Sequence, residues 1–251
     1  MLNIMLNIML KVIFNKLDEI FNNMMANKLP KIIIISICVV LLVIVLVLGG
    51  YLGNRFYCKK RLETIDNLFG EESFISADQN ETSDGYNLTY GELTWRGMNK
   101  ITEYMKLNGY PKKTFIDLGS GNGRTLAYAI LGGFEEAKGT ELFKKRHEYA
   151  TNMREKLDKS MRDKIKLTNA DLFTLDPSYF SAGSVIFISN LLYSEALTQK
   201  LIDFLSDHTP SDVVIVLSTC PENLQKFRLK QQINTPMSWA ADSICHVLSK
   251  M

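Results

Sequence analysis

The chain has 251 residues with a formal net charge of +2, of which 46% are hydrophobic and 22% charged. This length predicts one domain of ordinary size plus additional elements, and four scattered cysteines without a C-x-x-C pair indicate neither a zinc site nor a disulfide framework. Residues 1–61 contain eight of the 29 Lys and Arg residues and only two acidic residues. Residues 62–251 are therefore mildly acidic, which argues against direct nucleic-acid binding by this chain.

Residues 1–31 form an N-terminal leader that begins with the short apolar repeat MLNIMLNIML. An amphipathic helix on a membrane surface is one interpretation of this pattern. A targeting segment is a second, although the leader has few Arg and Ser residues for an organelle transit peptide. A weakly ordered leader is the third, and the sequence leaves all three open.

Residues 32–53 predict a single transmembrane helix. They carry no charge, and about 20 apolar residues at a rise of 1.5 Å each cross the ~30 Å core of a bilayer. The stretch is longer than a signal-peptide core, and no A-x-A-like cleavage site follows it. Lys28 and Lys31 precede it, whereas Arg55, Lys59, Lys60 and Arg61 follow it. This excess predicts a single-pass protein with its C-terminal domain on the cytosolic side of an unidentified membrane.

Residues 54–89 are expected to form a juxtamembrane helix and an acidic loop. Residues 56–69 can continue as a short polar helix, and residues 70–89 are rich in Asn, Ser, Asp and Gly. We expect a folded domain to begin after this loop and to cover residues 90–251.

Tyr90-Gly91-Glu92 opens the predicted domain, just before a helix. Thr94 can cap that helix through its hydroxyl group, and Met98, Ile101 and Met105 form its apolar face. Tyr90 and Glu92 therefore lie in a loop that can fold over a ligand at the edge of the domain.

The stretch FIDLGSGNGR, residues 115–124, predicts a buried strand, a glycine turn and the start of a helix. The turn contains Gly119, Ser120, Gly121 and Gly123, and Asp117 ends the strand before it. Glycines allow a ligand to approach the backbone, and the following helix N-terminus offers free N–H groups. A dinucleotide fingerprint would require glycine at Arg124, and no Gly-Lys-Ser/Thr of a P-loop follows.

Two further carboxylates follow the next predicted strands. A strand over residues 136–140 ends at Glu141, and a strand over residues 164–168 is followed by Asp171 and Leu172. Because the carboxyl ends of parallel strands meet at one edge of a sheet, these acids and Asp117 should lie together there.

The later strands complete a doubly wound α/β sheet. A fourth strand over residues 184–188 leads to Asn190, and the apolar run at residues 212–218 predicts a central parallel strand. Residues 237–239 and 244–248 are expected to form two closing strands, one of them antiparallel.

The spacing D-x-G-x-G-x-G resembles motif I of the class I S-adenosylmethionine (SAM) methyltransferases. This resemblance implies a Rossmann-like fold: a seven-stranded, mostly parallel sheet with helices on both faces, here preceded by one transmembrane helix. It implies SAM as the cofactor, with Asp117 and the glycine turn at its methionine end. Glu141 would contact the ribose, and Asp171 with Leu172 the adenine.

A narrower resemblance rests on Y-G-E at 90–92, FIDLGSGNGR, GTE at 139–141, AD at 170–171 and VIFISN at 185–190. Together these resemble the Dot-one (disruptor of telomeric silencing) family of histone-lysine methyltransferases without a SET domain, over roughly residues 86–251. The resemblance implies a histone H3 lysine as substrate and places Tyr90 and Glu92 over SAM and the lysine channel. The family's Asn-Asn-Phe signature is Ser189-Asn190-Leu191 here, so only the second Asn is retained.

Other acceptors remain open. The predicted anchor resembles the layout of the single-pass mitochondrial methyltransferases that modify lysines of membrane proteins, although their loop before motif I is Pro-rich. A small-molecule methyltransferase near the membrane is another alternative, and a SAM-binding membrane scaffold is a non-enzymatic one.

The predicted reaction is direct displacement, in which a neutral lysine amine attacks the methyl carbon of SAM in line. Lysine has a reference pKa of about 10.4, and an apolar channel favours its neutral form. Leu191, Leu192 and the catalytic candidate Tyr193 would build this channel, with Tyr90 as its roof. Asn190 could hold the amine, and also SAM, without titrating. Neither a general base nor a metal is predicted.

Overall fold

The computed structural model describes residues 11–12, 15–16, 18–19, 22, 31–70 and 91–251. The chain divides into two compact units, residues 1–59 and residues 60–251. The predictions for most of the leader, for the acidic loop beyond residue 70 and for Tyr90 lie outside the described residues.

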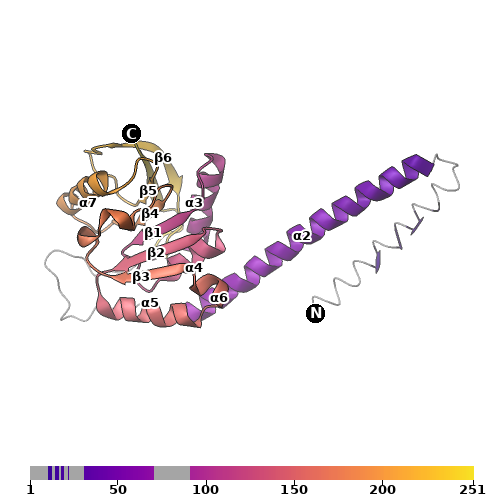
Figure 1. The fold of residues 1–251 in the computed structure, drawn as a ribbon, viewed down its shortest axis with the longest axis horizontal. Helices are drawn as coiled ribbons and strands as arrows, with labels where there is room; N and C mark the ends of the chain where they lie inside the picture. Colours follow the sequence, from indigo (N-terminus) through magenta and orange to yellow (C-terminus); the bar gives the residue numbers. More distant parts are fainter. Residues whose placement is uncertain (1–10, 13–14, 17, 20–21, 23–30, 71–90) are drawn as a thin grey trace. The chain divides into compact units, whose positions relative to one another are not determined.

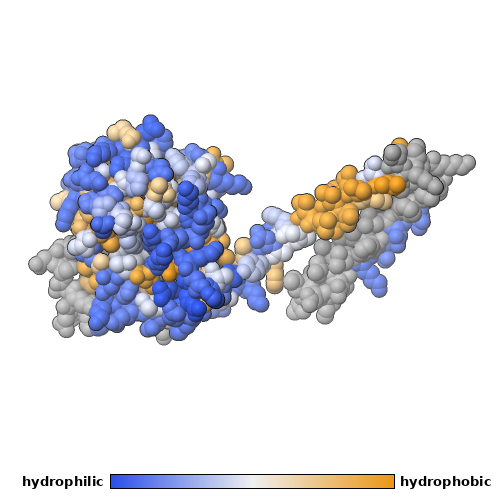
Figure 2. Space-filling view, in the orientation of Figure 1, coloured by the Kyte–Doolittle hydropathy of each residue, from blue (hydrophilic) through white to orange (hydrophobic). Residues whose placement is uncertain are grey.

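Helix α2, Lys31–Phe69, is 39 residues long. Its apolar part is unburied, and by length and composition the helix can cross a membrane. Figure 2 shows apolar side chains gathered along this helix, whereas the visible face of the second unit is mostly hydrophilic. The predicted apolar N-terminal helix is confirmed, and the polar helix expected over residues 56–69 is its continuation.

The second unit is built on a seven-stranded sheet in the order β3-β2-β1-β4-β5-β7-β6. Its strands are β1 (Thr114–Leu118), β2 (Glu136–Glu141), β3 (Ile165–Asn169), β4 (Val185–Ile188), β5 (Val214–Leu217), β6 (Phe227–Asn234) and β7 (Ile244–Lys250). Neighbouring strands from β3 to β5 are parallel, whereas β7 is antiparallel to both β5 and β6. The predicted α/β sheet, mostly parallel, is confirmed.

Helices cover both faces of this sheet (Figure 1). They are α3 (Trp95–Leu107), α4 (Arg124–Leu131), α5 (Lys144–Lys156), α6 (Lys159–Arg162) and α7 (Glu195–His208), with 3-10 turns η1 (Leu172–Thr174) and η2 (Pro177–Tyr179). Alternate side chains of β1 point to opposite faces, as the strand period requires. Phe115 joins the hydrophobic cluster that includes α3 and α4, and Ile116 joins the cluster that includes α7.

The last turns of α2 belong to the second unit. Ile65 and Phe69 are 1% and 2% exposed and join the same hydrophobic cluster as α3 and α4. The Arg61 guanidinium donates to Asp158 and Ser160 at 3.0 Å each, at the start of α6. Residues 60–69 are therefore packed as part of this unit, although the sequence marks them only as a polar helix.

One predicted closing strand is wrong. Residues 237–239 make a single bridge, between Met237 and Leu93, and the outer strand of the sheet is β6 instead. In β6 only Phe227 and Ile233 are buried, so the strand lacks the alternating apolar pattern that would have revealed it. The other closing strand, predicted at 244–248, is β7.

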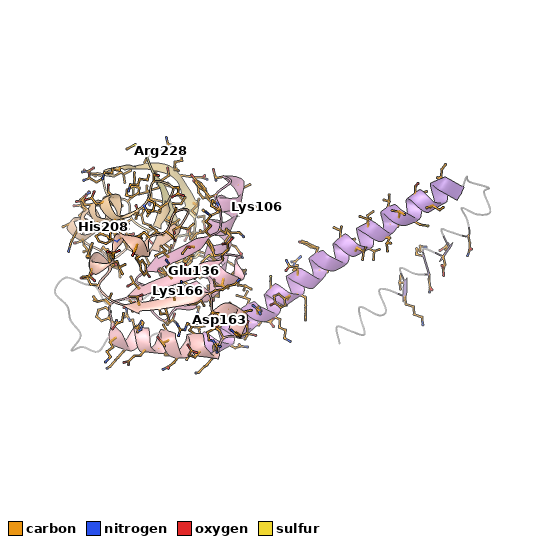
Figure 3. All side chains as sticks on the ribbon, viewed as in Figure 1. Lys106, Glu136, Asp163, Lys166, His208 and Arg228 are labelled. Atoms are coloured by element: carbon orange, nitrogen blue, oxygen red, sulfur yellow. The ribbon has the colours of Figure 1, made fainter. Side chains whose placement is uncertain are left out.

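In the view of Figure 3, Lys106, His208 and Arg228 lie at the outer margin of the second unit, whereas Glu136 and Lys166 lie over the sheet. Glu136 and Lys166 form an ion pair near the amino ends of β2 and β3. That edge is opposite the carboxyl ends of these strands, where the candidate site lies.

Candidate functional site

The glycine turn between β1 and α4 has the backbone that its sequence predicts. Gly119, Gly121 and Gly123 have φ values of 96°, 53° and 83°, a region that residues with a Cβ rarely adopt. The N–H groups of Gly119 and Ser120 both donate to the Thr140 carbonyl at 2.9 Å, which fixes the turn to the end of β2. No atom lies within 4 Å of the position of a Cβ at Gly119, so this glycine faces open space.

A cavity of about 330 Å³ opens at this edge of the sheet. It is lined from the ends of four parallel strands: Leu118 and Gly119 after β1, Thr140–Phe143 with Arg146 after β2, Ala170–Leu172 after β3, and Ser189 with Leu191–Tyr193 after β4. Gly91 and Trp239 complete the lining. Parallel α/β sheets bind ligands at this edge.

Glu141 joins the glycine turn to the end of β2. Its two carboxylate oxygens accept from the Gly121 N–H at 2.8 Å and from the Phe143 N–H at 2.9 Å. The side chain is 5% exposed and lines the cavity. Burial raises the pKa of this carboxyl, and the two backbone hydrogen bonds partly oppose the rise.

Asp117 lies buried beneath the turn and is 3% exposed. Burial, and then the charges of Glu141 and Glu92, raise its pKa to about 8, while a hydrogen bond from Thr125 opposes the rise. Mutual repulsion among the three carboxyls therefore favours the protonated form of Asp117 when no cation is bound, and a nearby cation reverses this preference. Such a site favours a cationic ligand.

Asp171 and Leu172 lie at the β3 end of the cavity. The Asp171 carboxylate accepts from the Phe173 N–H at 3.0 Å and so caps η1. Its remaining acceptor capacity can serve a ligand. Ser120 is placed differently: its hydroxyl lies 2.6 Å from where a Cβ of Gly139 would be, toward β2, and Ser120 does not line the cavity.

Asn190 is fully buried, and its amide is engaged by the protein itself. Its Nδ2 donates to the Thr219 carbonyl at 2.8 Å, and its Oδ1 accepts from the Thr219 N–H at 3.0 Å. These bonds join the ends of β4 and β5. Ser189 and Tyr193, on either side along the chain, line the cavity, whereas Asn190 does not.

Sequence reasoning missed Trp239 as a site residue. A Cβ at Gly91 would lie 2.2 Å from two atoms of the Trp239 ring, so only glycine allows this close approach. The ring is 41% exposed at the cavity, beside the half-exposed Leu191 and Leu192. It supplies an aromatic wall that Ser189-Asn190-Leu191 lacks. An aromatic residue in Met237-Ser238-Trp239 could have indicated a ligand wall, but the sequence analysis expects a strand there.

Arg146 and Phe143 were also missed. The Arg146 guanidinium is 5.3 Å from the centre of the Phe143 ring, and both residues line the cavity after β2. In the sequence, only their positions two and five residues after Glu141 could have indicated that they lie near a ligand.

The comparisons with known proteins match this architecture. The model of the family described as histone methylation protein DOT1 matches residues 75–240. No curated protein matches the sequence significantly.

Similar solved structures include three methyltransferases. The mitomycin 7-O-methyltransferase MmcR is 12% identical, with a TM-score of 0.48. The match covers 62% of this chain and 54% of MmcR, so this chain spans about half of the length of MmcR. The methyltransferase domain of bacterial CtHen1-C is 17% identical with a TM-score of 0.48, covering 62% and 97%. An RNA methyltransferase from Salinibacter ruber, in complex with S-adenosyl-L-homocysteine, is 18% identical with a TM-score of 0.43, covering 60% and 89%.

Proposed function

The chain belongs to the family of histone methylation protein DOT1, and from this premise we propose that it transfers a methyl group from SAM to the side-chain amine of a protein lysine. It is a SAM-dependent methyltransferase. Family membership supports a protein acceptor, with a histone lysine as the first candidate.

SAM fits the chemistry of the cavity. Its ammonium and sulfonium groups are cationic, and the carboxyls of Asp117, Glu141 and Glu92 make the β1 end of the site negative. The open space over Gly119 admits a close approach to the backbone. We assign Glu141 to the ribose hydroxyls and Asp171 to the adenine amine, and the position of both side chains in the cavity lining supports this.

The acceptor side of the cavity is apolar. Leu191, Leu192, Tyr193 and Trp239 line it, next to the hydroxyl of Ser189. Such walls strip water from an incoming ammonium and lower its pKa, which favours the neutral amine that can act as a nucleophile. This apolar mouth beside a cluster of carboxyls is the observation that supports a lysine acceptor most directly.

In this mechanism SAM supplies the electrophilic methyl group. Asp117 and Glu141 hold the cationic end of the cofactor against the glycine turn, and the apolar walls align the amine and exclude water. We assign Asn190 a positioning role, because its bonds to Thr219 fix the strand end that carries Ser189 and Leu191. The proton leaves the ammonium before transfer, and no residue of the chain is assigned as a base.

The apolar helix α2 favours a second acceptor class, a membrane protein, over a histone. The proposal includes a single-pass anchor through residues 32–53 and a cytosolic catalytic domain, because four cations follow the apolar stretch within residues 55–61. Protease treatment of sealed vesicles should then digest residues 60–251 on intact cytosolic-face-out vesicles. Protection of that segment would contradict the orientation.

Methyl transfer from radiolabelled SAM by the full chain in detergent tests the function. Nucleosomes, free core histones and a solubilised membrane fraction serve as acceptors in parallel. The blank is Gly121→Arg, because Gly121 has φ +53° and its N–H binds Glu141. We expect labelled protein with the wild type and a loss of at least about 100-fold with the variant.

The acceptor that is labelled decides between the candidates. Label on histones supports the family substrate, and label only in the membrane fraction supports a membrane protein. Binding of S-adenosylhomocysteine (SAH) without transfer to any protein would contradict the protein-lysine proposal and favour a small-molecule acceptor or a SAM-binding scaffold.

A further inference from the structure

Arg124 contacts three groups outside its own helix. It is the first residue of α4, directly after the glycine turn. Its guanidinium donates to the Gly70 carbonyl, lies 5.8 Å from the centre of the Phe69 ring, and has its Nε 3.5 Å from the Glu92 carboxylate. The side chain is 18% exposed, so these contacts are largely shielded from water.

The first of these contacts closes the C-terminal end of α2. Gly70, with φ 55°, ends the helix in the left-handed conformation, and its N–H donates to the Asp66 carbonyl at 2.9 Å. The Tyr149 hydroxyl donates to the Phe69 carbonyl at 3.3 Å. A helix C-terminus carries partial negative charge and unpaired carbonyls, so a cation such as Arg124 stabilises it.

The third contact fixes Glu92. This residue directly follows Gly91, which lines the cavity, and its side chain is 9% exposed. Ser238 holds its backbone from the opposite side, with bonds of 2.9 Å to its N–H and 2.8 Å to its carbonyl. The Glu92 charge also raises the pKa of Asp117. A buried carboxylate in this position needs a cation to stay ionised and oriented, and Arg124 provides it.

We propose that Arg124 is a positioning residue that ties the C-terminal end of α2 to Glu92 and to the glycine turn. The C-terminal end of α2, at Phe69 and Gly70, is thereby coupled to the cofactor site and is not only a linker. This inference rests on the proposed function, because it takes SAM as the ligand of the cavity. One guanidinium serves the carbonyl and the carboxylate together, which a lysine ammonium cannot do in the same planar geometry.

Calorimetric binding of SAH to the full chain in detergent tests the role of Arg124. We expect Arg124→Gln to weaken SAH binding roughly tenfold, and Arg124→Lys to restore part of the loss. The matched control is Arg61→Gln, which removes another contact of α2, the ion pair with Asp158 at the start of α6. The control should keep the wild-type affinity.

A double-substitution cycle tests whether Arg124 acts through Glu92. In the Glu92→Gln background, Arg124→Gln should weaken SAH binding much less than tenfold, because the carboxylate that Arg124 orients is gone. Unchanged affinity in Arg124→Gln, or the same loss in both backgrounds, would overturn the assignment. If Arg124→Gln does not fold, Arg124→Lys and Glu92→Gln complete the same cycle.

Hydrogen exchange gives a readout that a purely structural role would not change. SAH binding to the wild type should slow amide exchange in residues 62–70, and this protection should vanish in Arg124→Gln and persist in Arg61→Gln. Wild-type protein that binds SAH without slowing exchange there would refute the coupling. Wild-type protein that does not bind SAH would instead refute the proposed function, so the two failures are distinct.

Discussion

Asp117 illustrates how function shapes a single residue. Its pKa is raised from 3.8 to about 8, so near pH 7 the folded protein holds a proton that the unfolded chain has released. The resulting penalty on folding is absent below pH 3.8, grows as the pH rises, and is complete above about pH 8. A cationic ligand favours the ionised carboxyl, and affinity for SAM should therefore rise with pH through this range.

Replacing Asp117 with asparagine should stabilise the ligand-free protein while weakening the binding of SAH. The amide keeps the shape of the carboxyl and removes its charge. We expect a melting temperature roughly 5 °C or more above the wild type at pH 8.5, and a smaller difference at pH 5. Thermal unfolding at both pH values measures this, with the exposed Asp242→Asn as control. Equal differences at the two pH values would contradict the raised pKa.

At the scale of elements, the ends of β4 and β5 depend on one side chain. Removing the amide of Asn190 takes away the partner of the part-buried N–H and carbonyl of Thr219. Asn190→Ala should therefore lower the free energy of unfolding by about 2–4 kcal/mol, measured in urea. Ser189→Ala is the matched control, because Ser189 lines the cavity and should affect methyl transfer more than stability. An unchanged midpoint in Asn190→Ala would show that these bonds contribute little.

The elements differ in how far their sequences reveal them. The strands β1, β4 and β5 are predictable because they are buried and mostly apolar, and the turn is predictable because it requires glycine. Strands β2 and β3 carry charged and polar residues, and their positions after the turn indicate them instead. Strand β6 is not predictable from its sequence, because it is an edge strand in which only Phe227 and Ile233 are buried and the other six residues are exposed. The capping of α3 by Thr94 was predicted and is present, with its hydroxyl accepting from the Gly97 N–H at 3.1 Å. The placement of Trp239 against Gly91 depends on a contact across about 150 residues, which no local pattern encodes.

At the scale of the whole molecule, the family match and the compact unit begin at different residues. The family model begins at residue 75, whereas the compact unit begins at Lys60. A chain that starts at residue 71 would lose the buried side chains of Ile65 and Phe69. We expect it to be less stable than residues 60–251 by about 3–6 kcal/mol, measured in urea. Equal unfolding midpoints would show that the end of α2 adds nothing to the core.

Strand β6 is the outermost strand at one edge of the sheet among the residues that the structure describes, and an edge strand can pair with another chain. Arg228 and Lys230 are exposed on this strand, and its register shifts between Leu229 and Gln231. Figure 3 shows Arg228 on the outer side of the domain. Two copies that met at these edges would bring like charges together on strands too irregular to pair over their full length. These features protect copies of the domain from joining their sheets edge to edge into aggregates.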